Sequence, residues 1–134
     1  MMFLVAVLIV AVLLLIAIKL TGKRAHKFDK EDYQVRFLKI ENRLRKDNPA
    51  SYPLAIINGD KLLDKALMEM GVSGKTMGDR LKRVGEKFED ENAVWRAHKL
   101  RNVIAHEADL EVSYRQAAES LGAYKQALRD LGAI

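Results

Sequence analysis

The sequence predicts an all-α protein in which an N-terminal transmembrane helix precedes a bundle of four long helices and one short helix. Two observations lead to this fold class. The first 18 residues carry no charge, and after them apolar residues recur every three or four positions, which is the helical period. No segment alternates as a strand does, and there is no internal repeat. We therefore divide the chain into a transmembrane helix (1–20), a basic juxtamembrane linker (21–28) and a helical bundle (29–134).

The N-terminal helix has the length of a membrane span, because about 20 apolar residues cross the hydrocarbon core. A cleaved signal peptide is the alternative, but it would need a positive start, a shorter apolar region and a small-residue cleavage site. Basic residues follow the span with no acidic residue among them: Lys19, Lys23, Arg24 and Lys27. The positive-inside rule then predicts a single-pass protein of the cell membrane, with its N-terminus outside and its C-terminal domain cytoplasmic. Residues 1–27 would contact membrane lipid.

Charge and composition narrow the class of function. The chain has a net charge of +5 and no cysteine. From residue 28 onward, however, 19 basic residues face 18 acidic ones, so the bundle is nearly neutral. This excludes a globally basic nucleic-acid-binding surface and leaves room for a local one. The absence of cysteine fits a reducing compartment.

Capping residues set the predicted helix limits. Five predicted helices begin at good N-terminal caps, which are Asp29, Ser51, Thr76 (with Asp79), Asp90 and Ser113 (with Gln116). The pair Asn48-Pro49 ends the first of them, while Gly71 and Gly132 are typical helix stops. A linker over 108–112 separates the last two helices.

The fourth helix of the bundle combines apolar periodicity with dense polar chemistry. At about 100° per residue, one side carries the apolar residues Ala93, Ala97, Leu100 and Ile104. The roughly opposite side carries His98, Arg101, Asn102 and His106. We therefore expect one side to pack in the core and the other to meet a ligand or a partner.

The run Arg101-Asn102-Val103-Ile104-Ala105-His106 resembles the signature of the HEPN superfamily (higher eukaryotes and prokaryotes nucleotide-binding). That signature is an Arg, usually followed by a polar residue, and a His after four to six intervening positions. The resemblance covers 29–134 and leaves the anchor outside. It implies a bundle of four to five helices and a metal-independent ribonuclease, a hydrolase that acts as a homodimer. Other members of the family are inactive binding modules.

Carried over to this chain, the resemblance implies three roles. His106 would be the acid/base group, Arg101 would hold the scissile phosphate, and Asn102 would orient the phosphate or His106. Arg101 and His106 differ by about 140° around the helix, which favours a composite site across a two-fold axis. Glu107 is either a solvated residue or a carboxylate that influences His106.

Four more residues are candidates for substrate binding. His98 is either a third member of the site or a surface histidine. Trp95 could stack on a base or be buried at an interface. Arg80 and Arg83 belong, with Lys82 and Lys87, to the best local basic patch, although such a run is usually a solvated helix face.

The remaining polar residues receive plainer interpretations. Asp60 and Asp64 lie four apart among lysines and suggest a solvated face, but either would be the natural counter-ion of Arg101 if it pointed at the fourth helix. His26 is interpreted as solvated. No cysteine, phosphate loop or pair of histidines four residues apart is present, so neither a metal nor a cofactor is expected.

Two functions remain open from the sequence. The first is a membrane-anchored HEPN-like domain that binds and cleaves RNA with an Arg/His site at a dimer interface. The second is a non-catalytic, membrane-tethered interaction or scaffold module, whose polar side would be a partner surface.

Overall fold

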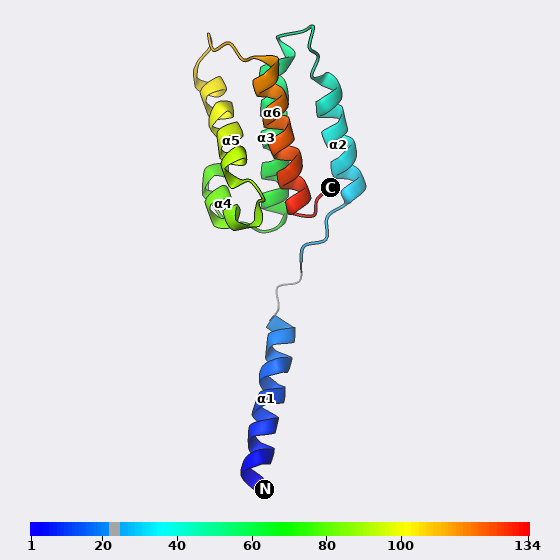
Figure 1. Ribbon diagram of the computed structural model, residues 1–134, viewed down its shortest axis with the longest axis vertical. Coiled ribbons are helices and arrows are strands. Elements are labelled where there is room, and N and C mark those ends of the chain that lie inside the picture. Colours follow the sequence, from blue (N-terminus) through cyan, green and yellow to red (C-terminus); the bar gives the residue numbers. More distant parts are fainter. Residues whose placement is uncertain (22–24) are drawn as a thin grey trace.

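The structure is a computed structural model that describes residues 1–21 and 25–134. Lys23 and Arg24 of the predicted basic cluster lie outside the described residues. The described residues form six α-helices, one 3₁₀ helix and no strand (Figure 1). The helices are α1 (Met2–Thr21), α2 (Lys30–Arg43), α3 (Ser51–Glu69), α4 (Met77–Val84), the 3₁₀ helix η1 (Gly85–Lys87), α5 (Glu91–His106) and α6 (Tyr114–Asp130). The all-α prediction is confirmed.

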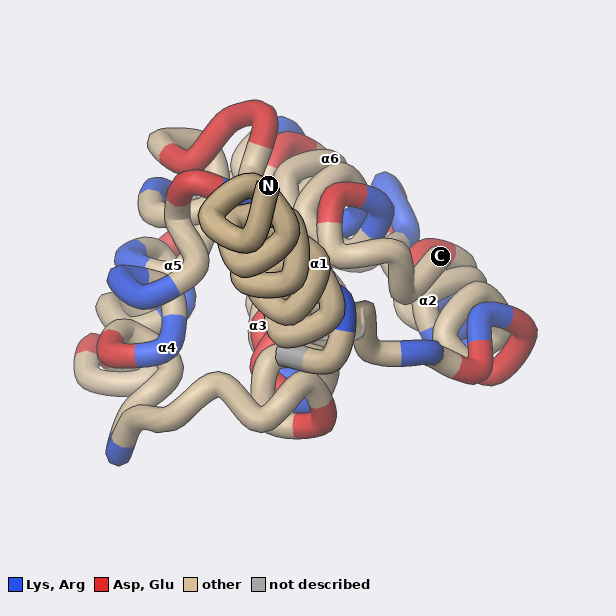
Figure 2. The backbone as a smooth tube through the Cα atoms, turned by 90° about the horizontal axis from the view of Figure 1, so that it is seen from below, with Lys and Arg blue, Asp and Glu red and all other residues tan. Residues whose placement is uncertain are grey.

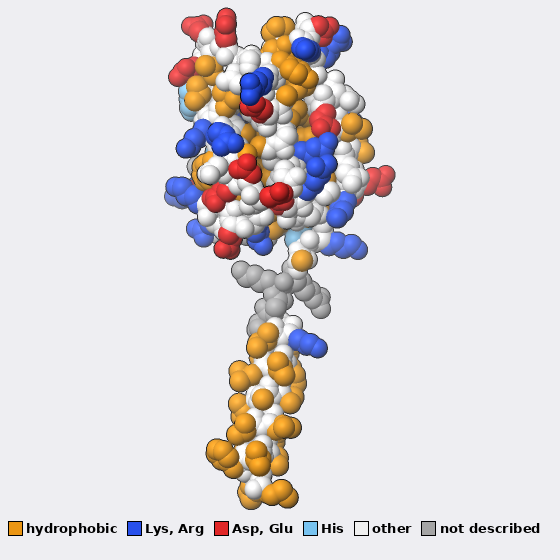
Figure 3. All heavy atoms as spheres, in the orientation of Figure 1, with side chains coloured by type: hydrophobic (Ala, Val, Ile, Leu, Met, Phe, Trp, Pro, Cys, Tyr) orange, Lys and Arg blue, Asp and Glu red, His pale blue; other side chains and the backbone are white. Residues whose placement is uncertain are grey.

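Helix α1 stands apart from the other helices and buries none of its surface on them. It has a mean hydropathy of 3.2 over Met2–Leu20, and among the described residues it is the one helix long and apolar enough to cross a membrane. Figure 3 shows apolar side chains along α1, whereas charged side chains of both signs are spread over the face of the folded domain that is in view. This exposed apolar surface requires an apolar environment.

Helix α3 is the centre of the folded domain. It packs against α2, α4, α5 and α6. In two perpendicular views, α3 and α6 lie in the middle, with α4 and α5 on one side and α2 on the other (Figures 1 and 2). The largest fully buried side chains come from α2, α3, α4 and α6: Tyr33, Phe37, Ile56, Leu63, Leu67, Leu81, Tyr124 and Leu128.

Most predicted caps are confirmed. Asp29 and Asp90 accept hydrogen bonds at the starts of α2 and α5, and reciprocal capping boxes open α4 (Thr76 with Asp79) and α6 (Ser113 with Gln116). Gly71 and Gly132 adopt φ values of 77° and 79° after α3 and α6. This left-handed conformation is a usual helix stop.

The turn between α2 and α3 corrects two predictions. Helix α2 ends at Arg43, before Asn48-Pro49, because Leu44 is already extended. Ser51 is the first residue of α3 and not its cap, since the preceding residue, Ala50, already has helical dihedrals. The Ser51 hydroxyl donates instead to the Asn48 carbonyl (2.6 Å) and accepts from the Arg45 backbone N–H (3.1 Å). It therefore stabilises the turn.

The segment before α2 belongs to the folded domain. Phe28 is buried in the core and contacts the Tyr33 ring edge to face, at 5.3 Å between centroids. His26 is not simply solvated, because its Nε2 lies 3.2 Å from Glu69 Oε1. The predicted linker is thus fastened to α3 at its C-terminal end.

Candidate functional site

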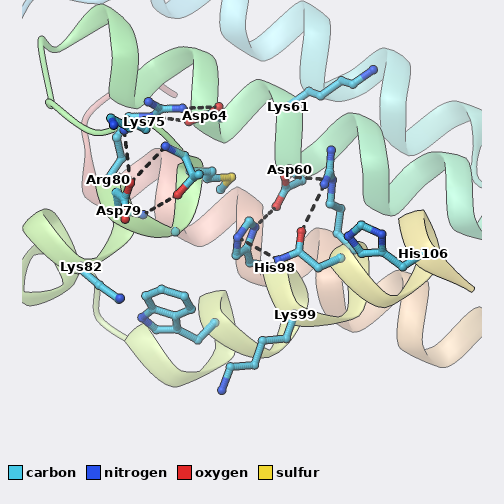
Figure 4. Close-up of a pocket in the computed structure, with 16 residues that line it drawn as sticks. Asp60, Lys61, Asp64, Lys75, Asp79, Arg80, Lys82, His98, Lys99 and His106 are labelled. Carbon is cyan, nitrogen blue, oxygen red and sulfur yellow. Dashed lines mark hydrogen bonds and ion pairs between the residues drawn. The ribbon is translucent and has the colours of Figure 1, made fainter.

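A cleft of about 630 Å³ lies between α3, the start of α4 and α5 (Figure 4). Its α5 wall carries the three predicted catalytic residues, Arg101, Asn102 and His106. The full lining comprises Asp60, Lys61 and Asp64 of α3, residues 75–80 and Lys82, and Trp95, His98, Lys99, Arg101, Asn102 and His106 of α5. The HEPN-like residues therefore border one common cavity.

A buried carboxylate, Asp60, joins three helices beside this cleft. Its side chain is only 5% exposed. Its Oδ1 accepts from His98 Nδ1 of α5 (2.8 Å) and from the Tyr124 hydroxyl of α6 (3.1 Å), and its Oδ2 lies 3.5 Å from Arg101 Nε. The conditional prediction that an α3 aspartate would be the counter-ion of Arg101 is confirmed.

We expected the polar side of α5 to face away from the core, but the structure buries part of it. His98 is 7% exposed and as well buried as its apolar neighbour Ala97. The physical reason is Asp60, since a buried carboxylate on α3 offers hydrogen bonds that make it favourable to bury polar groups of α5. The edge of α5 that lines the cleft is therefore the one next to α3.

The hydrogen bonds of Asn102 indicate which ring nitrogen of His98 donates and which accepts. Arg101 Nη1 lies 3.1 Å from Asn102 Oδ1, and because a guanidinium only donates, the amide oxygen of Asn102 faces it. The amide nitrogen of Asn102 then faces His98 Nε2 at 3.3 Å and donates to it. This is the pattern of the Nδ1–H tautomer of His98, in which the ring donates to Asp60 and accepts from Asn102.

Tyr124 reaches Asp60 because the residue before Asp60 on α3 is Gly59, which has no side chain to block the tyrosine ring. A Cβ at Gly59 would lie 2.6 Å from the Tyr124 ring, so only glycine leaves room for the ring. Burial raises the pKa of the Tyr124 phenol well above its ordinary value, and the neighbouring Asp60 charge raises it further. Tyr124 therefore remains a hydrogen-bond donor at every physiological pH.

The α4 wall is fixed by two other aspartates. Arg80 donates from Nε and Nη2 to Asp64 (2.6 and 2.9 Å) and from Nη1 to the Gly74 carbonyl (2.7 Å). The hydrogen bonds to Asp64 raise the pKa of the Arg80 guanidinium. Asp79 is occupied by the capping box, in which the Thr76 backbone N–H lowers its pKa. Arg80 is therefore a structural residue of the wall.

Four lysines surround the cleft and give it an excess of positive charge. Each is exposed, and none lies within ion-pair distance of a carboxylate in the described part of the chain; they are Lys61, Lys75, Lys82 and Lys99. The three carboxylates of the lining, by contrast, all form internal hydrogen bonds. The free charge of the cleft is therefore positive, which suits an anionic ligand.

The structure brings most of the predicted site residues together. Catalytic candidates Arg101, Asn102 and His106 line the cleft, as do His98, Trp95 and Arg80. Arg83 does not; it is exposed on α4 away from the lining. The Trp95 indole donates to Glu91 (3.4 Å) and its ring lies 6.0 Å from that of His98.

Sequence reasoning missed Tyr124 and three of the rim lysines. Tyr124 has the spacing of a core residue, and only the approach of α6 to Gly59 directs its hydroxyl to Asp60. Lys61, Lys75 and Lys99 come from three separate segments, so their proximity arises only on folding. Among the described residues, no group of three or more His, Asp or Glu side chains is arranged to hold a metal ion.

Comparisons with protein-family models, with curated proteins and with solved structures find no match to this chain. Its own features define it as an all-helical domain with a cationic cleft, preceded by a helix long enough to span a membrane. Its function must be inferred from that cleft.

Proposed function

We propose that the domain binds RNA in the cleft between α3, α4 and α5 and cleaves it without a metal ion, as the resemblance to HEPN proteins implies. The observation that carries the proposal is the common lining: Arg101, Asn102 and His106 border one cavity whose rim lysines lack carboxylate partners. Phosphodiesters are the anions that such a combination of guanidinium, imidazole and ammonium groups suits.

The chemistry would be a transesterification within the RNA. His106 accepts the proton of a ribose 2′-hydroxyl, whose oxygen forms a bond to the adjacent phosphorus. The bond from phosphorus to the 5′-oxygen breaks, and the imidazole of His106, which now carries the proton from the 2′-hydroxyl, supplies it to that leaving oxygen. The products are a 2′,3′-cyclic phosphate and a 5′-hydroxyl, so atoms and charge balance.

Arg101 would bind the scissile phosphate. It donates one hydrogen bond, to Asn102, and its buried Nε has no hydrogen-bond acceptor in the described chain. Because Nε is buried against Asp60, the donors left for an anion are the remaining N–H groups of Nη1 and Nη2. Asp60 holds the guanidinium in place by charge. Such a preorganised guanidinium stabilises charge that develops on the phosphoryl oxygens.

A homodimer would complete the site. His106 is exposed at the last residue of α5, and the angle between it and Arg101 around the helix separates their directions. Two copies of α5 related by a two-fold axis would present the Arg101 of one protomer to the His106 of the other.

The cellular setting belongs to the same proposal. Helix α1 would anchor the protein in the cell membrane by a single pass, and Lys19 in its last turn together with Lys27 after it favours a cytoplasmic domain. The domain would then bind RNA next to the cytoplasmic surface of the membrane.

The test is RNA cleavage by the full chain in detergent micelles, with a fluorophore–quencher RNA strand. We expect Arg101→Ala and His106→Ala each to lower the rate about 100-fold or more, and Arg115→Ala, an exposed control on α6, to leave it unchanged. A 2′-deoxy strand should resist cleavage. No cleavage by the native protein, or undiminished cleavage by both variants, would remove the catalytic proposal.

Mixing the two inactive variants tests the dimer. If Arg101 and His106 act across the interface, half of the sites in each mixed dimer are intact, and an equal mixture regains about one quarter of native activity. A site within one protomer would regain none.

A second function is favoured by one specific observation. Within one protomer Arg101 already contacts Asp60 and Asn102, which is the arrangement expected if the polar side of α5 only stabilises the fold. The domain would then be a membrane-tethered interaction module. RNA that neither binds nor is cleaved, together with a stable dimer, would support this second function.

A further inference from the structure

A second groove, of about 440 Å³, lies between α2 and α3 on the other side of α3 from α5. Its only acidic lining residue is Asp32. Five cations line it: Arg36, Lys39, Arg43, Lys61 and Lys65. The excess of positive charge is larger here than in the cleft, in a domain whose overall charge is close to zero.

Three of these cations have no carboxylate partner in the described chain. Arg36 is paired with Asp32 (2.7 Å), and Lys65 is paired with Glu69 (3.6 Å). That leaves the exposed side chains Lys39, Arg43 and Lys61. Lys39 and Arg43 are four residues apart on one face of α2, and like charges at this spacing destabilise a helix. Arg43 lies in the last turn of α2, where a cation suits the helix dipole. The repulsion between the two side chains remains, and an anionic ligand would offset it.

The groove and the cleft share one lining residue, Lys61. Figure 4 shows its side chain extending from α3 toward α2, away from the centre of the cleft. Together the two cavities are lined by ten Lys and Arg side chains and four carboxylates. Each of the four carboxylates already accepts a hydrogen bond from a side chain or a cap of the protein.

We propose that the groove between α2 and α3 binds phosphates of the same RNA strand that occupies the cleft. The ligand is then a strand of several nucleotides and not a mononucleotide, and Lys39, Arg43 and Lys61 carry its backbone from the cleft across α3. This inference rests on the proposed function, whose substrate it specifies.

An RNA strand fits the groove better than a membrane surface does. The groove is concave, with Ile40 and Leu62 in its lining, and a flat bilayer does not enter a concavity. Arg43 is the last residue of α2, at the end remote from the linker, and about 13 residues at 1.5 Å each separate it from Lys30. Two of the three unpartnered cations, Lys39 and Arg43, thus lie toward the C-terminal end of α2, which points away from the anchor (Figure 1).

The test measures the binding of non-cleavable 2′-O-methyl RNA to the full chain in zwitterionic nanodiscs, by fluorescence anisotropy. Two oligomers are compared, one of about 4 and one of about 12 nucleotides, lengths within the range of single-strand sites. The groove variant is Lys39→Gln/Arg43→Gln and the cleft variant is Lys75→Gln/Lys99→Gln. A control with the same loss of charge is Arg115→Gln/Arg129→Gln on α6.

We expect the groove variant to bind the long oligomer about tenfold more weakly at low salt, with a salt slope smaller by about 1.4, because each lost phosphate contact removes about 0.7. Its affinity for the short oligomer should not change. The cleft variant should weaken both oligomers, and the control neither.

Three results would overturn the inference. If the groove variant behaves like the control while the cleft variant weakens both oligomers, the groove is not part of the RNA site and the proposed function stands. If the native chain binds neither oligomer, the proposed function fails as well. If phosphatidylserine in the nanodisc lowers the native affinity for the long oligomer to that of the groove variant, the groove is a lipid site.

Discussion

Replacing Asp60 with Asn tests the most connected residue of the domain. Asp60 accepts hydrogen bonds from α5 and α6 and lies 3.5 Å from Arg101 Nε. Asparagine has the same shape but no charge, so the substitution removes the electrostatic part of this junction and leaves the packing. We expect the domain to remain folded and to be less stable.

The magnitude follows from the contacts that are lost. A hydrogen bond to a charged group contributes about 1.5–3 kcal/mol, and a neutral one about 1 kcal/mol. In the variant, the amide oxygen can still accept from His98 and Tyr124, but the amide nitrogen faces Arg101, which also only donates. Because the Arg101 side chain is 31% exposed, solvent screens part of this repulsion. We therefore expect Asp60→Asn to lower the free energy of unfolding by about 2–3 kcal/mol.

Removing the acceptor altogether should cost more. Asp60→Ala leaves the donors of His98 and Tyr124 buried without a partner, for which we expect about 3–5 kcal/mol. Tyr124→Phe removes one hydrogen bond to the carboxylate, which at 3.1 Å is longer than the bond from His98 at 2.8 Å. We expect it to cost about 1.5 kcal/mol, the lower end of the range for a charged acceptor. We therefore predict that the loss of stability is largest for Asp60→Ala, smaller for Asp60→Asn and smallest for Tyr124→Phe.

Urea titration of the full chain in detergent measures these differences by linear extrapolation. Trp95 is the only tryptophan and lies next to His98, so its emission reports on the domain without a signal from α1. Asp109→Asn, in the exposed loop after α5, is the control for a change of charge alone. If Asp60→Asn differs from this control by less than about 0.5 kcal/mol, the network has no energetic importance and our reasoning is wrong.

Two further predictions concern stability. Gly59→Ala would place a Cβ 2.6 Å from the Tyr124 ring and should cost about 1–3 kcal/mol in the same titration, whereas Gly122→Ala, whose Cβ meets nothing within 4 Å, should not destabilise. The Thr76 backbone N–H lowers the pKa of Asp79 in the folded state. The ionised Asp79 carboxylate therefore stabilises the folded state above the ordinary carboxyl pKa, and this stabilisation is lost as the pH falls through the lowered value. Asp79→Asn should therefore reduce the loss of stability below about pH 4, measured by urea titrations at several pH values; an unchanged acid limb would contradict this.

Local signals made most helix limits predictable. The caps at Asp29, Thr76, Asp90 and Ser113 satisfy backbone donors within a few residues of themselves, so tertiary structure does not alter them. Ser51 is different, because its hydroxyl serves the turn before it instead of the helix that it begins. The residue type alone does not indicate whether a serine near a proline will bind the backbone of the helix that follows or of the turn that precedes it.

The site was less predictable, because its key contacts join residues distant in sequence. Periodicity placed His98 on the polar side of α5, which is correct for the helix alone. It could not indicate that Asp60, 38 residues earlier, would be buried beside it and make burial of the histidine favourable. A buried polar network reverses the usual relation between polarity and exposure.

Composition misled in a similar way about charge. The bundle is nearly neutral, but the structure sorts its charges: several carboxylates lie around the ends of α5, at 86–91 and 107–111, while lysines border the cleft and the groove beside α3. Net charge is a sum and carries no information about position, whereas binding depends on local potential. A neutral domain can therefore hold a cationic track, provided that its acidic residues are placed elsewhere or are occupied by internal hydrogen bonds. Both conditions hold around α3. The occupation of carboxylates by internal hydrogen bonds is illustrated by Asp60, Asp64 and Asp79. Because these three charges are paired inside the protein, the unpaired lysines determine what the surface attracts.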